Sequence, residues 1–111
     1  MAEVRVCGVD DVKPGSAHRV DVDGLRLAVV RLAARDGAAD DDWYVIGDRC
    51  SHADYSLSEG EVWADEREIE CPKHGSTFSL ETGDPETLPA TQPVPVYTVR
   101  VDGDDVYVEV S

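Results

Sequence analysis

Two short segments of this chain each contain one cysteine and one histidine, and a fold that uses them together must bring both segments to one place. They are Cys50-Ser-His52 and Cys71-Pro-Lys-His74, with 18 residues between His52 and Cys71. Thiol and imidazole groups are soft ligands that suit a transition metal or an iron–sulfur cluster. The pattern therefore predicts a metal centre that is held by two loops.

The spacing within the first pair narrows the kind of centre. A single residue between Cys50 and His52 makes it difficult for both side chains to reach one tetrahedral ion, whereas each loop can supply one ligand to each of two irons. A 2Fe-2S cluster fits this spacing, with Cys50 and Cys71 on one iron and His52 and His74 on the other, which is the ligand arrangement of Rieske centres. A Cys2His2 zinc site that joins the two loops is the alternative.

Apolar and polar residues alternate along most of the chain, and a period of two residues indicates strands. Asp23-Gly24 and Asp102-Gly103 tolerate the backbone angles of tight hairpin turns. Helix is expected only as single turns, so we predict an all-β fold. The predicted strands lie around 4–6 and at 17–22, 25–32, 43–46, 62–64, 67–71, 77–80, 96–101 and 106–110.

Two segments interrupt this alternation. Residues 34–42 carry charges and turn-forming residues with no apolar period, which is typical of an exposed loop. The segment from Asp84 to Pro95 contains four prolines, which prevent regular ladder pairing. We expect the second segment to be a stiff cover near the metal centre.

Length, charge and cysteine count bound the class of protein. The 111 residues suit a single domain, and 24 acidic against 10 basic residues give a formal charge of −14, which disfavours binding to nucleic acid or to an anionic membrane surface. No run is long and apolar enough for a membrane span, and the first residues lack the features of a signal peptide. Three cysteines are an odd number, which favours free or metal-bound thiols. We therefore expect a cytoplasmic protein.

At the two metal-binding segments the sequence resembles the Rieske-type ferredoxins of bacterial aromatic-ring dioxygenase systems. Their pattern is C-x-H, a spacer of similar length, and C-x-x-H followed by glycine, which is Gly75 here. The resemblance extends along nearly the whole chain. It implies a Rieske fold, in which antiparallel sheets form a base and a small cluster-binding part, here about residues 47–85, presents the histidines at its tip. Residues 1–111 would then form a single Rieske domain.

The chain departs from the respiratory Rieske proteins at three positions. Those proteins have an additional cysteine in each cluster loop, and the two form a disulfide, whereas the matching residues here are Tyr55 and Lys73. They also have a tyrosine near a ligand sulfur where this chain has Phe78. Ser76 does match the serine that can hydrogen-bond a cluster sulfide, so Gly75 and Ser76 are expected to surround the cluster. Fewer hydrogen bonds to sulfur predict a reduction potential in the lower part of the Rieske range.

The resemblance implies an electron-transfer protein rather than an enzyme. A flavin-dependent ferredoxin reductase would reduce the cluster, and a terminal oxygenase or another redox enzyme would take the electron. The chain lacks residues for either partner's chemistry: only His18 remains for a mononuclear iron, and no G-x-G-x-x-G motif follows a strand. The alternatives are a subunit of a larger enzyme, like the small subunit of nitrite reductase, or an accessory protein of iron–sulfur cluster assembly.

The acidic residues are concentrated around the predicted centre. Residues 40–86 contain 14 acidic and 3 basic side chains, whereas the other 64 residues contain 10 and 7. A partner with a basic face would be steered toward the cluster. General solubility is an equally simple explanation of this charge.

Residues outside the predicted ligand set are expected to have structural roles. We expect Cys7 to be a small buried residue, His18 to lie on the surface, and Trp43 and Trp63 to pack in the core. Tyr55 and Leu57 are either exposed contacts around the cluster or packed beneath its loop. Gly60, Gly75 and Gly83 are expected where tight loops require backbone angles or close approaches that a side chain would obstruct.

Overall fold

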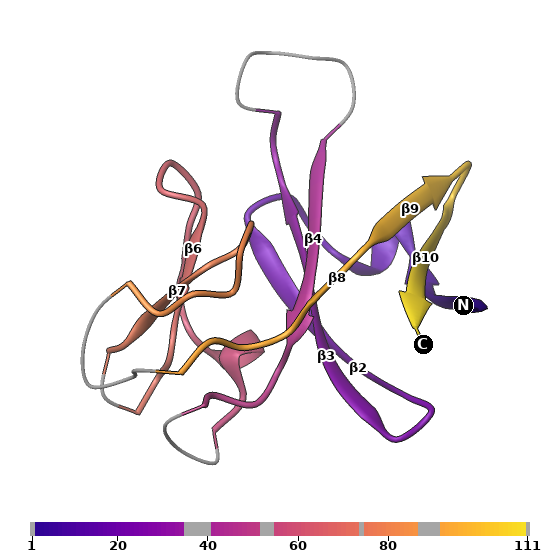
Figure 1. The fold of residues 1–111 in the computed structure, drawn as a ribbon. Helices are drawn as coiled ribbons and strands as arrows, with labels where there is room; N and C mark the ends of the chain where they lie inside the picture. Colours follow the sequence, from indigo (N-terminus) through magenta and orange to yellow (C-terminus); the bar gives the residue numbers. More distant parts are fainter. Residues whose placement is uncertain (1, 35–40, 52–54, 74, 87–91, 111) are drawn as a thin grey trace.

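The computed structural model describes residues 2–34, 41–51, 55–73, 75–86 and 92–110 (Figure 1). Strands dominate these residues, and helix occurs there only as two short 3-10 turns, η1 (Val9–Asp11) and η2 (Leu57–Glu59). The predicted all-β class and the expectation of single helical turns are therefore confirmed. No helix in these parts of the chain has the length and apolar character needed to cross a membrane.

The strands of the described residues form three antiparallel sheets. In the end sheet the order is β1-β10-β9, in the central sheet it is β2-β3-β4-β8, and in the small sheet it is β5-β6-β7. The strands are β1 (Ala2–Gly8), β2 (Ser16–Val22), β3 (Leu25–Leu32), β4 (Asp42–Gly47), β5 (Val62–Trp63), β6 (Glu68–Glu70), β7 (Thr77–Ser79), β8 (Val96–Tyr97), β9 (Val99–Asp102) and β10 (Asp105–Val110).

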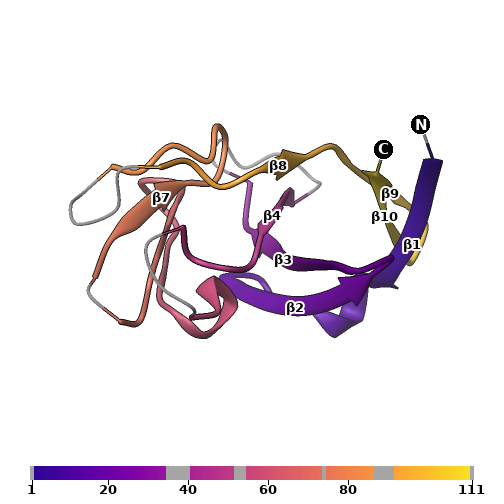
Figure 2. The same cartoon turned by 60° about the horizontal axis from the view of Figure 1, so that its bottom comes forward.

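The three sheets follow one another along the molecule (Figures 1 and 2). The small sheet lies at one end, the end sheet with both chain termini lies at the other, and the central sheet lies between them. The two predicted metal loops belong to the half that contains the small sheet, because Cys71 follows β6 of that sheet and Cys50 lies in the same hydrophobic core as Cys71. The candidate centre is therefore remote from the termini.

Strand β3 explains how a thin molecule has two hydrophobic cores. Successive side chains of a strand point to opposite faces, and here Ala28 and Val30 enter one core while Leu27 and Val29 enter the other. Both faces of β3 are covered, so its sequence is almost continuously apolar, as expected of a central buried strand. The first core, between the central and small sheets, also contains Cys50 and Cys71, Leu57 and Phe78 among its members; we call it the site core.

The hairpin turns agree with the sequence, whereas one predicted strand is wrong. Asp23 (φ 50°) and Gly24 (φ 79°) both have the positive φ that the predicted β2–β3 turn requires. The predicted strand at 96–101 is in fact two strands: β8 pairs with β4 in the central sheet, and β9 pairs with β10 in the end sheet. The chain changes sheets at Thr98, and the apolar alternation continues across this change, so it did not reveal the break.

The predicted strand at 67–71 is shorter in the structure. Strand β6 covers Glu68–Glu70, and Arg67 belongs to the preceding turn with φ 56°. The side chain of Arg67 is buried. Its Nη2 atom donates to the Asp42 carboxylate at 2.8 Å and to the Ala33 carbonyl at 3.1 Å. Arg67 thus joins the small sheet to the central sheet. Of the predicted exposed loop at 34–42, positions 35–40 lie outside the described residues, and Asp42 begins β4.

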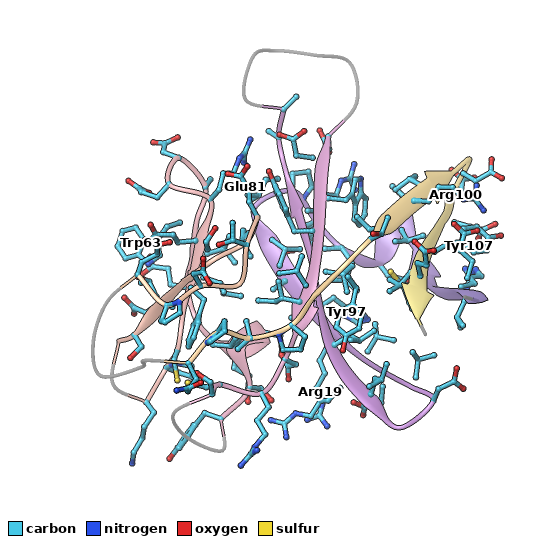
Figure 3. All side chains as sticks on the ribbon, in the orientation of Figure 1. Arg19, Trp63, Glu81, Tyr97, Arg100 and Tyr107 are labelled. Atoms are coloured by element: carbon cyan, nitrogen blue, oxygen red, sulfur yellow. The ribbon has the colours of Figure 1, made fainter. Side chains whose placement is uncertain are left out.

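The prediction that Trp63 packs in the core is wrong. Val62 is partly buried against the site core, and the pleat of β5 turns the next side chain outward, so Trp63 is 40% exposed (Figure 3). Trp43 is partly buried against the second core. His18 is exposed on β2, as expected. Cys7 is buried as predicted, and desolvation raises the pKa of its thiol, which therefore stays protonated.

Candidate metal centre

The first loop begins at the end of β4 and returns to the same place. The backbone N–H of Cys50 donates to the carbonyl of Tyr55 at 2.9 Å, and Arg49 and Ser56 form a β-bridge. The N–H of Leu57 then donates to the Asp48 carbonyl at 2.6 Å. These contacts close the loop at its base, so Cys50 has a defined position although the loop lies outside any sheet.

The second loop connects β6 to β7 and is closed in the same way. The N–H of Cys71 donates to the carbonyl of Ser76 at 2.7 Å, and the N–H of Gly75 donates to the Cys71 carbonyl at 3.1 Å. Gly75 has φ +77°, a backbone conformation that residues with a side chain rarely adopt, as expected for this position. In both loops the cysteine N–H therefore bonds to the carbonyl five positions later.

The structure brings the two predicted cysteine ligands into one core. Cys50 is 1% exposed and Cys71 is 2% exposed, and both belong to the site core with Leu57 and Phe78. The two predicted histidine ligands, His52 and His74, lie outside the described residues. The assignment of the cysteines to one shared site is thus supported by their burial together, and the assignment of the histidines stays a prediction.

The residues present fit a 2Fe-2S cluster. Neither Cys50 nor Cys71 is part of a disulfide, so both sulfurs can act as thiolate ligands. Their apolar surroundings restrict solvent access, which protects a cluster and influences its potential. Ser76 is buried beside them in the second loop, whereas Gly75 is exposed.

The buried carboxylate of Asp48 anchors the first loop to the central sheet. Asp48 Oδ1 accepts the N–H of Ser58 at 2.8 Å, and Oδ2 faces Nε of Arg26 on β3 at 3.4 Å. Arg26 Nη2 also donates to the hydroxyl of Ser56 at 3.0 Å. A buried charge of this kind needs such partners. Sequence reasoning missed this anchor, because nothing in the pattern separates Asp48 from the other acidic residues of 40–86.

Two glycines allow backbone segments to approach closely around the loops. A Cβ at Gly60 would collide with the carbonyl oxygen of Glu70 in β6. Because glycine has no side chain, the backbone after the first loop can lie directly against β6. A Cβ at Gly83 would collide with the carbonyl oxygen of Val94, and the N–H of Val94 donates to the Gly83 carbonyl at 2.9 Å. The expectation that Gly60 and Gly83 occupy positions without room for a side chain is confirmed.

The proline-rich segment is bonded to the first loop. The hydroxyl of Ser51, which lies between the predicted ligands Cys50 and His52, donates to the carbonyl of Gln92 at 2.6 Å. At the base of the same loop, the N–H of Gly47 donates to the Pro95 carbonyl at 2.9 Å. The stretch 92–95 is thus held at both ends. Residues 84–86 of the predicted segment are also described, whereas 87–91 lie outside the described residues.

Replacing Ser51 by alanine is expected to loosen this attachment. The change removes one hydrogen bond near the surface, which corresponds to about 0.5–1 kcal/mol of unfolding free energy and to a fall in Tm of about 2–5 °C. Thermal unfolding followed by circular dichroism measures the change. Ser58→Ala is the matched control, because Ser58 makes its contact to Asp48 through its backbone N–H. An equal fall in both variants would contradict a specific role for the Ser51 hydroxyl.

Comparisons with known proteins agree with this geometry. The chain is 38% identical over 109 residues to the 3-phenylpropionate/cinnamic acid dioxygenase ferredoxin subunit of Escherichia coli K12. The aligned residues cover 98% of this chain and 94% of that relative. The ferredoxin of carbazole 1,9a-dioxygenase from Nocardioides aromaticivorans IC177 has 40% identity, a TM-score of 0.85 and 97% coverage of both chains. A chain from the complex of reduced oxygenase and oxidized ferredoxin in carbazole 1,9a-dioxygenase has 37% identity and a TM-score of 0.80, with 96% of this chain and 91% of that chain covered.

The family model described as the Rieske [2Fe-2S] domain matches residues 2–98, which include both cysteine loops and the small sheet. The match spans most of the chain, and the described part of the site supplies two buried cysteines that lie in one core and form no disulfide. The Rieske fold predicted from the sequence is confirmed, and the zinc alternative is not supported. This chain belongs to the Rieske family and carries one 2Fe-2S cluster of the Rieske type.

Proposed function

We propose that this protein is a one-electron carrier that takes electrons from a flavin-dependent ferredoxin reductase and passes them to a terminal oxygenase. The observation that carries the proposal is likeness over nearly the full length, at 37–40% identity, to ferredoxin components of dioxygenase systems, including a chain from a complex of oxygenase and ferredoxin. The cluster supplies one-electron chemistry, so no bond in a substrate is made or broken on this chain.

The proposed ligands divide between the two loops. Cys50 and Cys71 hold one iron, and His52 and His74 hold the other, within a cluster-binding part of about residues 47–85. Gly75 and Ser76 lie next to the cluster in the second loop. The burial of both cysteines in the site core supports this arrangement.

The protein's own residues keep the site in one geometry. Asp48 and its partners hold the first loop against the central sheet, and Phe78 is buried in the same core as both cysteines. A preorganised site needs little rearrangement when its charge changes. This rigidity suits a carrier that is reduced by one partner and oxidised by another.

The charge around the site favours transient docking. Residues 40–86 contain 14 acidic and 3 basic side chains, and one of the basic ones, Arg67, is buried. A basic face on the redox partner is attracted to this half of the molecule, and added salt weakens the attraction. The proposed partners therefore associate rapidly and separate readily.

Affinity capture tests the proposed partners. The loaded protein, immobilised through its C-terminus, is exposed to lysate of its source organism at low salt, and the retained proteins are identified by mass spectrometry. A flavin reductase together with an oxygenase, both released by added salt, is the expected result. One large enzyme retained in stoichiometric amount at high salt would instead identify a subunit of that enzyme, and cluster-assembly scaffold proteins would identify an accessory protein.

The reduction potential is expected below about +200 mV, in the lower part of the Rieske range of about −150 to +300 mV. The reason is that Phe78 has no hydroxyl to donate to a ligand sulfur, and fewer such hydrogen bonds stabilise the reduced cluster less. Protein-film voltammetry of the loaded protein at neutral pH measures this potential. The variant Phe78→Tyr, which adds a hydroxyl to the same ring, is the comparison. A wild-type potential above about +200 mV would contradict the reasoning.

We further propose that the protein works in the cytoplasm. None of the three cysteines forms a disulfide, whereas small secreted domains usually rely on disulfides. Fractionation of source cells, with immunodetection of the protein in cytoplasmic and extracytoplasmic fractions, tests this location. Recovery outside the cytoplasm would contradict it.

A further inference from the structure

A direct contact connects the two cluster loops at their outer side. The Nζ atom of Lys73, in the second loop, lies 5.3 Å from the centroid of the Tyr55 ring, in the first loop. This distance is within the range in which a cation is attracted to the face of an aromatic ring. Both side chains are exposed, and Tyr55 is one of the few large apolar side chains with an exposed fraction above two fifths.

The position of this contact in each loop is what makes it informative. The carbonyl of Tyr55 accepts the N–H of Cys50 and so closes the first loop. Lys73 lies within the turn of the second loop that is closed by the hydrogen bond from the Gly75 N–H to the Cys71 carbonyl. Each of the two side chains therefore belongs to a segment that a backbone hydrogen bond to a ligand cysteine holds in place. A link between the two side chains restrains the separation of the loops, and with it the separation of the two ligand cysteines.

No disulfide joins the two loops. The chain has three cysteines, and none of them is in a disulfide; two are the proposed ligands, and Cys7 lies in the second core. The predicted absence of a disulfide between the loops therefore leaves non-covalent contacts to restrain their outer ends.

We propose that Tyr55 and Lys73 form a cation–π clasp that holds the two loops together and slows loss of the cluster. They are positioning residues, and the inference rests on the proposed cluster site. The clasp also holds the positive charge of Lys73 in the second cluster loop, within a strongly acidic half of the molecule. Because a cation favours the addition of an electron nearby, the same contact raises the reduction potential.

A double-mutant cycle on the loaded full-length protein tests the clasp. The variants are Tyr55→Leu, Lys73→Met and the double variant, and the readout is the rate at which visible cluster absorbance disappears in the presence of an iron chelator. Each single change is expected to accelerate the loss about two- to fivefold. Because each removes the same contact, the double variant is expected to lose its cluster no faster than the more affected single variant.

Conservative and distant variants separate the clasp from general destabilisation. Tyr55→Phe keeps the aromatic face and Lys73→Arg keeps the cation, so both are expected to retain the wild-type rate. The matched control is Tyr107→Leu. The Cζ atom of Arg100 lies 4.7 Å from the centroid of the Tyr107 ring, at the opposite end of the molecule (Figure 3). That change breaks the same kind of contact and is expected to leave the rate of cluster loss unchanged.

The potential provides a second readout that a purely mechanical role would not move. Lys73→Met is expected to lower the reduction potential, and Tyr55→Leu to lower it less, because the charge remains but is no longer held in place. Additive effects of the two changes on the rate, or an unchanged rate in both single variants, would overturn the clasp while leaving the cluster site intact. A wild-type chain that binds no iron and sulfide would overturn the site and the clasp together.

Discussion

Serine in place of Cys50 or Cys71 is expected to abolish cluster retention. Each cysteine is the sole ligand that its loop contributes to the proposed Cys-ligated iron, and a hydroxyl is a poor substitute for a thiolate at such an iron. Both side chains are buried in the site core, so an outside ligand has little access to the empty position. Iron and acid-labile sulfide analysis of the purified variants is expected to give values near zero.

The third cysteine provides the control for this experiment. Cys7 is also buried and free, but it lies in the second core, away from the loops. Cys7→Ser makes the same chemical change at a similarly buried position and is expected to keep the wild-type iron and sulfide content. Full content in Cys50→Ser or in Cys71→Ser would contradict the ligand assignment.

Truncation of Phe78 to alanine is expected to destabilise the protein by about 3–5 kcal/mol. Phe78 is fully buried in the site core, and removal of its ring leaves a cavity in the core that also holds both ligand cysteines. The same cavity lets the two loops move, so the cluster is expected to be lost faster. Urea unfolding followed by circular dichroism measures the stability, and the decay of visible absorbance measures the loss of the cluster.

A truncation in the other core separates these two effects. Leu27 is also fully buried, but its side chain lies on the opposite face of β3, in the second core. Leu27→Ala is expected to cost about 2–5 kcal/mol and to leave the rate of cluster loss in the folded protein near the wild-type value. Equal acceleration in Leu27→Ala and Phe78→Ala would show that global stability, rather than packing under the loops, controls cluster retention.

Local patterns were sufficient to predict much of the fold. The alternation around Asp23-Gly24 identified the β2–β3 hairpin, because the turn residues and the strand period indicate the same structure. The nearly continuous apolar run of β3 indicated burial but not the reason, which is that its two faces belong to different cores. The change of sheet at Thr98 was missed, because pairing partners distant in sequence determine where a strand ends.

The sequence was sufficient to predict the ligand residues of the candidate site, but not the contacts that hold the two ligand loops in place. The four proposed ligands are recognisable because their residue types and spacing are uncommon. The buried carboxylate of Asp48 and its pairing with Arg26 could not be predicted, since the two are 22 residues apart and both types are common on protein surfaces. The Tyr55–Lys73 contact could not be predicted from the sequence for a similar reason. The two residues lie in different loops, and only the fold places one beside the other.

This chain carries one electron on one Rieske-type cluster. A coulometric titration of the purified protein, combined with iron, zinc and acid-labile sulfide analysis of the same sample, tests this most directly. We expect about two irons and about two sulfides per chain, and uptake of about one electron as the cluster is reduced. A chain that contains about one zinc, no sulfide and takes up no electron would contradict the account.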